Sequence, residues 1–133
     1  MLRISFNWLP TGIRAHLNFE VYSMSDMLTI HYTNVQLEQI LEEAMIYMCA
    51  CPAQVSEQLL LLRKLFDYQR SCISKGSLLV EVHRRIADST RIAHAEMEKC
   101  LDEVLHIEGW DLQTLTMPEG LRKLRQKSIE QDQ

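Results

Sequence analysis

One uninterrupted helical pattern dominates this 133-residue sequence and constrains its fold more than any other feature. The pattern runs from Leu78 to about Glu108 and contains neither Gly nor Pro. As a helix it would be roughly 46 Å long at 1.5 Å per residue. Ser77 is suited to cap its first turn, and Gly109 to end it in the left-handed conformation. Because the apolar side of so long a helix has to be covered by other helices, the pattern predicts an all-α fold.

Composition and chain length indicate one helical domain. The sequence has only four Gly and three Pro, which disfavours a many-turned β fold, and its hydrophobic content of 47% is ordinary for a globular chain. Residues 1–27 show no sustained helical or strand period. We expect this leader to be either extra translated sequence or a flexible arm, and residues 28–133 to form a single helical-bundle domain.

Three further helices are predicted at 33–51, 53–73 and 117–127. Thr33 and Gln36 fit a capping box at the start of the first of these, and Thr116 and Glu119 fit another at the start of the last. The loop at residues 74–77 is short, and short loops join antiparallel helices. The sequence therefore predicts an antiparallel three-helix bundle with a short fourth C-terminal helix and a flexible N-terminal leader.

Apolar residues at helical spacing predict the buried face of each helix. In helix 53–73, two adjacent stripes indicate contact with two neighbours. The first stripe consists of Val55, Leu59, Leu62, Phe66, Gln69 and Ile73, and the second of Leu61, Leu65, Tyr68 and Cys72. The stripe of the long helix consists of Leu79, Val82, Ile86, Ala93, Met97, Cys100, Val104 and Ile107. In the last helix, Leu121 and Leu124 are expected to face inward.

The second half of the first predicted helix, residues 44–51, is apolar on nearly every side. Such a segment is either buried all round or part of an interface between chains. The interface interpretation predicts a homodimer in which the contact uses Met45, Ile46, Met48 and Cys49.

Three of the four cysteines are predicted to lie at one corner of the bundle. In an antiparallel pair of helices joined at residues 74–77, Cys100 lies level with Cys51, and Cys49 lies within about one turn of them. Cys72 falls at the opposite end, about 30 Å away by helix rise.

This corner could bind a metal ion or simply be packed. Thiolates from Cys49, Cys51 and Cys100, together with His94 or His106, would suit zinc or another thiophilic metal. The alternative is ordinary packing, because free Cys behaves as a small buried hydrophobe. The spacing Cys49-x-Cys51 also differs from the C-x-x-C of zinc knuckles.

No set of residues indicates an enzyme. Glu103-x-x-His106 has the spacing used in di-iron helix bundles, but such sites need the pair twice and it occurs once. His83 and His94 lie beside the apolar stripe of the long helix, where we expect satisfied boundary residues, with Tyr68 as a hydrogen-bond partner of His83. The sequence has no Gly-rich phosphate loop and no nucleophile elbow.

Charge and hydropathy disfavour other partners. A formal net charge of −4 at pH 7 argues against nucleic acid, which needs a cationic surface. The longest apolar run, residues 44–53, is too short for a membrane span of about 20 residues. The N-terminus lacks the apolar block of a secretory signal, so we expect a cytoplasmic protein with reduced cysteines.

These observations predict a small soluble helical interaction or adaptor module without catalytic activity or cofactor. It is expected to pair with itself and with an unidentified protein. The alternative is a thiol-based metal-binding or redox-sensing protein that uses Cys49, Cys51 and Cys100.

Overall fold

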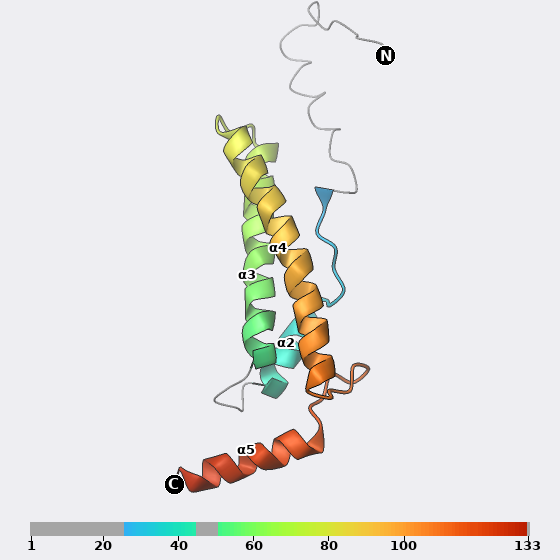
Figure 1. Ribbon diagram of the computed structural model, residues 1–133. Helices are drawn as coiled ribbons and strands as arrows, with labels where there is room; N and C mark the ends of the chain where they lie inside the picture. Colours follow the sequence, from blue (N-terminus) through green and yellow to red (C-terminus); the bar gives the residue numbers. More distant parts are fainter. Residues whose placement is uncertain (1–25, 45–50, 133) are drawn as a thin grey trace, which may run out of the picture.

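The computed structural model describes residues 26–44 and 51–132. The described residues form four helices, α2 (Asn34–Ala44), α3 (Cys51–Ser74), α4 (Val80–Ile107) and α5 (Glu119–Gln131) (Figure 1). They include no β-strand, only one isolated bridge between Asp111 and Thr116. The predicted all-α class is therefore confirmed. Within these ranges, no helix combines the length and the apolar character needed to cross a membrane.

Helices α3 and α4 run antiparallel as a long hairpin (Figure 1). The turn after α3 contains Gly76 in the left-handed conformation, with φ 71°. The N–H groups of Gly76 and Ser77 bond back to carbonyl oxygens of the last turn of α3, which that turn would otherwise leave without partners. Ser77 Oγ accepts from the N–H of Leu79 at 3.2 Å, and α4 begins at Val80, two residues later than predicted.

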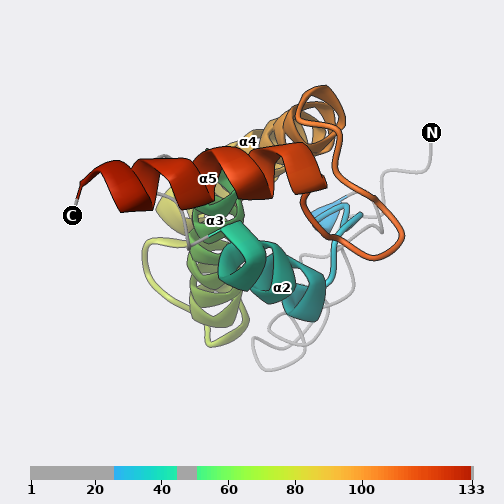
Figure 2. The same ribbon diagram turned by 90° about the horizontal axis from the view of Figure 1, so that it is seen from below.

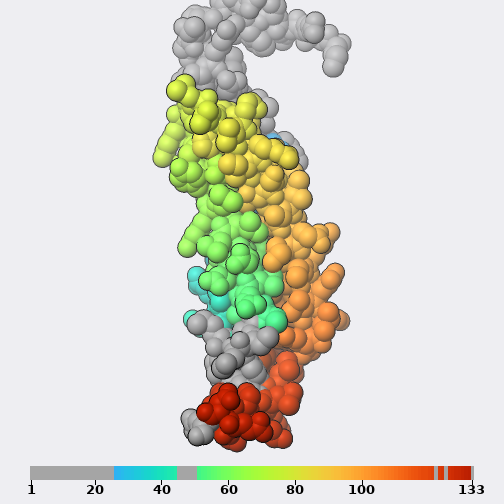
Figure 3. Space-filling model, turned by 60° about the vertical axis from the view of Figure 1, so that its left-hand side comes forward, coloured from blue at the N-terminus to red at the C-terminus, as the bar shows by residue number. Residues whose placement is uncertain are grey.

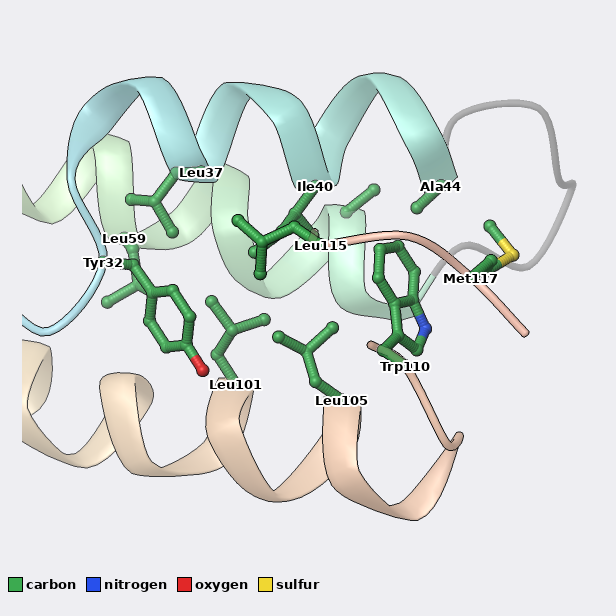
Figure 4. Packing of buried hydrophobic residues seen from close by; sticks show 11 residues of the cluster. Tyr32, Leu37, Ile40, Ala44, Leu59, Leu101, Leu105, Trp110, Leu115 and Met117 are labelled. Atoms are coloured by element: carbon green, nitrogen blue, oxygen red, sulfur yellow. The ribbon is translucent and has the colours of Figure 1, made fainter. Parts of the chain in front are cut away.

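Helix α2 lies against the end of the hairpin that holds the start of α3 and the last turns of α4 (Figure 4). Its predicted capping box is confirmed, because Thr33 N–H donates to Gln36 Oε1 at 2.9 Å and Gln36 N–H donates to Thr33 Oγ1 at 3.2 Å. The core between the three helices includes Leu37, Ile40, Ala44, Ala53, Leu59, Leu101 and Leu105. With 11 residues against 24 in α3 and 28 in α4, α2 covers only part of the hairpin.

The C-terminal end of α4 closes as the sequence predicts. Gly109 adopts φ 74°, and the N–H of Trp110 bonds to the carbonyl of Leu105 at 3.0 Å. This arrangement places Trp110, which is 5% exposed, against the core beside Leu105. The following loop returns Leu115 and Met117 to the same core (Figure 4).

Helix α5 crosses beneath the end of the hairpin (Figure 2). The predicted capping box at its start is wrong, because Thr116 pairs with Thr114 through their hydroxyls at 2.8 Å and α5 begins only at Glu119. Leu121 is half-buried and packs against the core, as predicted. The inward placement of Leu124 is wrong, since its side chain is 64% exposed.

The buried face of α4 differs from the predicted one. It consists of Ala87, Thr90, His94, Glu98, Leu101 and Leu105. Five of these residues directly follow a residue of the predicted stripe, so the true face is turned by about 100° around the helix. The predicted stripe is therefore only partly covered, and Val82 and Ile107 are 49% and 82% exposed.

Helix α3 differs in the same way. Its second predicted stripe is wrong, because Leu61, Leu65 and Tyr68 are 50%, 40% and 64% exposed. Arg63, between the two leucines, is buried instead. The first predicted stripe is confirmed at three fully buried positions, Leu59, Phe66 and Gln69.

Candidate functional site

The predicted interface lies outside the described residues. Met45, Ile46, Met48 and Cys49 all fall within residues 45–50. Contact between copies through this segment stays a prediction.

The predicted metal site includes Cys49, which also lies outside the described residues. Cys51 and His106 are exposed, and Cys100 is half-buried. Among the described residues, no group of three or more His, Cys, Asp or Glu side chains is placed to hold a metal ion. Zinc binding through Cys49, Cys51 and Cys100 therefore stays a prediction, which elemental analysis of the wild type and a Cys100→Ser variant would test.

A buried polar network joins α3, α4 and the segment before α2, and its centre is the guanidinium of Arg63. Arg63 Nη2 bonds to Glu98 Oε1 and to the carbonyl oxygen of Tyr32, each at 2.7 Å. Arg63 Nη1 donates to Asn34 Oδ1 at 2.6 Å, and Nε donates to His94 Nε2 at 3.0 Å. The opposite oxygen of Glu98 accepts from the N–H of Tyr32 at 3.3 Å. With Arg63 6% and Glu98 1% exposed, this is a desolvated ion pair whose hydrogen-bonding groups are largely satisfied.

The same geometry fixes the state of His94, which is fully buried. Because Arg63 Nε can only donate, His94 Nε2 accepts, and the proton of the neutral ring is on Nδ1. Burial, the positive charge of Arg63 and the nearby His31 lower the pKa of His94 to about 4. His94 is therefore neutral at pH 7 and acts as an acceptor in the core. His94 is thus a core residue and not the boundary residue that the sequence predicts.

A second polar contact joins α3 and α4 near the turn of the hairpin. His83 Nδ1 lies 2.6 Å from Gln69 Oε1, and His83 Nε2 lies 3.1 Å from Ser77 Oγ. The expected pairing of His83 with Tyr68 is wrong, because Tyr68 lies on the exposed side of α3. This contact, like the Arg63 network, aligns the two long helices.

A pocket of about 390 Å³ opens beside the Arg63 network and is lined by His31, Tyr32, Gln36, Glu98, Lys99, Asp102 and Leu112. Its polar groups already bind one another, since Arg63 bonds to Glu98 and Tyr32 Oη donates to Asp102 Oδ1 at 2.7 Å. Burial and this hydrogen bond raise the pKa of Tyr32, so its phenol stays neutral. None of the described residues that line the pocket is a Ser, Thr or Cys nucleophile.

The side of the hairpin away from α2 is apolar and exposed. Arg63 bonds to Asn34 at the start of α2. Leu61 and Leu65 lie two residues before and two residues after Arg63, so each of their side chains is about 160° from that of Arg63 around the axis of α3. On α4, Asp102 bonds to Tyr32, which precedes α2. Cys100 and Val104 lie two residues before and two residues after Asp102, so their side chains are about 160° from that of Asp102 around the axis of α4. These apolar residues of α3 and α4 therefore point away from α2, and those of α3 also point away from α4, because Arg63 bonds to His94 and Glu98 as well.

We call this surface the open face; Figure 3 shows the hairpin from its α3 side, with α3 in green and α4 in yellow to orange. It consists of Leu61, Leu65, Tyr68 and the half-buried Cys72 on α3, and of Val82, Ala93 and the half-buried Ile86, Cys100 and Val104 on α4. In the described part of the chain, no other helix packs on this side. Some of the residues that the sequence assigned to the core of a bundle are thus exposed on this surface.

Comparison of the chain with protein-family models, with curated proteins and with solved structures found no match. The functional conclusion therefore rests on the contacts of the chain itself.

Proposed function

We propose that the chain is a non-catalytic helical interaction module that forms a homodimer through the open face. The observation that supports this proposal is the exposure of four large apolar side chains along one side of the hairpin, between 40% and 64% each. Burying a large apolar side chain contributes on the order of 2 kcal/mol. Contiguous exposed apolar patches on folded proteins mark sites of contact with other molecules.

The dimensions of the open face suit a stable interface. Helix α3 has 24 residues and so is about 36 Å long. Two helices packed 8–10 Å apart present a surface roughly 20 Å wide. The resulting area of about 700 Å² is close to the roughly 800 Å² per partner that standard protein interfaces bury.

The packing around Arg63 would give this module a fixed shape. In the proposed unit, α2, α3 and α4 form a three-helix bundle in which α2 covers one side of the hairpin and a second copy covers the other. The Arg63, Glu98 and His94 contacts hold α2 and the hairpin in one relative arrangement. A rigid surface loses little conformational entropy on binding, which favours association.

The test compares two matched substitutions by light scattering at micromolar concentration. Leu61→Glu places a charge in the open face, where Leu61 is 50% exposed. Val35→Glu places the same charge on α2, where Val35 is 72% exposed and lies away from the open face. We expect the wild type and the Val35 variant to be dimers, and the Leu61 variant to be a monomer with unchanged helical circular dichroism. A monomeric wild type, or a Leu61 variant that stays dimeric, would overturn the proposal.

A further inference from the structure

We propose that the open face binds the second copy in antiparallel orientation, about a two-fold axis perpendicular to α3 and α4. This inference rests on the proposed function and adds the orientation of the partner and the charged residues that select it. Two-fold interfaces are self-complementary, so each charged position at the edge of the face has to meet its complement on the same surface.

The edges of the open face carry opposite charges at the two ends of the hairpin. At the end near α2, the exposed acidic residues include Glu57 on α3 and Glu96 on α4. At the end near the turn, the exposed basic residues include Lys75, just after α3, and Arg85 on α4. Helical spacing of 100° per residue places Glu57, Glu96 and Arg85 about 50° to 90° from the centre of the apolar stripe of their own helix. Glu96 also lies 3.7 Å from Lys99 on its own helix, and that exposed contact is weak.

An antiparallel copy brings these ends together in a single register. If the axis passes level with residue 66, Glu57 faces Lys75 of the second copy. Arg63 contacts His94 and Gln69 contacts His83, so these pairs lie at the same height along the hairpin. Residue 66 is midway between Arg63 and Gln69, and it is therefore level with the midpoint between His83 and His94 on α4.

On α4, Glu96 can pair with Arg85 of the second copy only if the two-fold axis passes near residue 90. This position lies within about 3 Å, along the helix, of the midpoint between His83 and His94. The same register places Lys64 opposite Tyr68 of the second copy, where the ammonium can lie against the ring.

In a parallel dimer, with the two-fold axis along the helices, residues of like charge come together instead of residues of opposite charge. There α3 faces α4 of the second copy, so the acidic Glu57 and Glu96 lie toward one end of the interface and the basic Lys75 and Arg85 lie toward the other. Like charges then meet at both ends of the interface, which disfavours that orientation.

Charge reversal distinguishes the two orientations by the sign of its effect on the dimer dissociation constant at low ionic strength. An antiparallel dimer contains two Glu57–Lys75 pairs, so Glu57→Lys turns both attractions into repulsions. We expect the dissociation constant to rise roughly tenfold. Lys75→Glu should have a similar effect, whereas an equimolar mixture of the two variants should form a heterodimer at least as tight as the wild type.

The control is Glu38→Lys, which changes the net charge equally at an exposed position on α2. It should leave the dissociation constant unchanged. A Glu57→Lys dimer that is as tight as the wild type or tighter, or a variant mixture that fails to form heterodimers, would overturn the antiparallel orientation and leave the proposed function standing. A monomeric wild type would instead overturn both.

Discussion

The state of His94 makes the stability of the fold depend on pH in a defined direction. Burial and the charge of Arg63 lower the pKa of His94 to about 4 in the folded chain, whereas an unfolded His titrates near 6.5. Between these two values the unfolded chain binds the additional proton, so the free energy of unfolding decreases as pH falls from 6.5 to 4. A pKa difference of about 2.5 units corresponds to about 3 kcal/mol lost across this window.

Urea denaturation monitored by circular dichroism at pH 7, 6, 5 and 4 would measure this loss. The matched variant is His94→Gln, whose side-chain oxygen can still accept from Arg63 but does not titrate near neutral pH. All other titrating groups are shared, so the difference between the two proteins isolates His94. Protein concentration has to be held constant, because dimerisation contributes to apparent stability. We expect the wild type to lose about 3 kcal/mol more than the variant between pH 7 and pH 4. Parallel pH profiles would refute the assignment of a neutral, buried His94.

Three further predictions concern stability, each measured by urea denaturation at pH 7. Glu98→Ala leaves the buried charge of Arg63 without its carboxylate and should cost about 3–5 kcal/mol, while Glu42→Ala at an exposed position of α2 should change stability by less than about 0.5 kcal/mol. Gly109→Ala forces a side chain into φ 74° and should cost roughly 1–2 kcal/mol; an unchanged midpoint would contradict the left-handed helix end. Thr33→Ala removes half of the capping box and should cost about 1 kcal/mol, and a neutral result would show that α2 does not need the cap.

Local signals in the sequence predicted helix ends well where a few neighbouring residues determine them. Thr33 with Gln36 marks the start of α2, Gly109 marks the end of α4, and Trp110 anchors the chain behind it. The match at Thr116 and Glu119 failed because Thr116 is held by the preceding loop instead. A capping pattern predicts a helix start only if tertiary contacts leave its residues available.

The buried faces were harder to predict because polar residues occupy part of the core. A hydrophobic pattern assigns Arg63 and Glu98 to the surface, yet each is desolvated by pairing with the other. With Arg63 and Glu98 buried, some of the apolar residues that were expected inside, such as Leu61, Leu65 and Val82, are exposed on the open face. The burial of Arg63 depends on its pairing with groups far along the chain, and helical periodicity contains no signal for such pairing.

Sedimentation equilibrium of the unmodified chain, from submicromolar to submillimolar concentration, tests the central claim most directly. A self-associating open face predicts an average mass that rises from one chain to two chains and then reaches a plateau. A mass of one chain over the whole range would contradict the claim, and a mass that rises beyond two chains would contradict the closed two-fold interface.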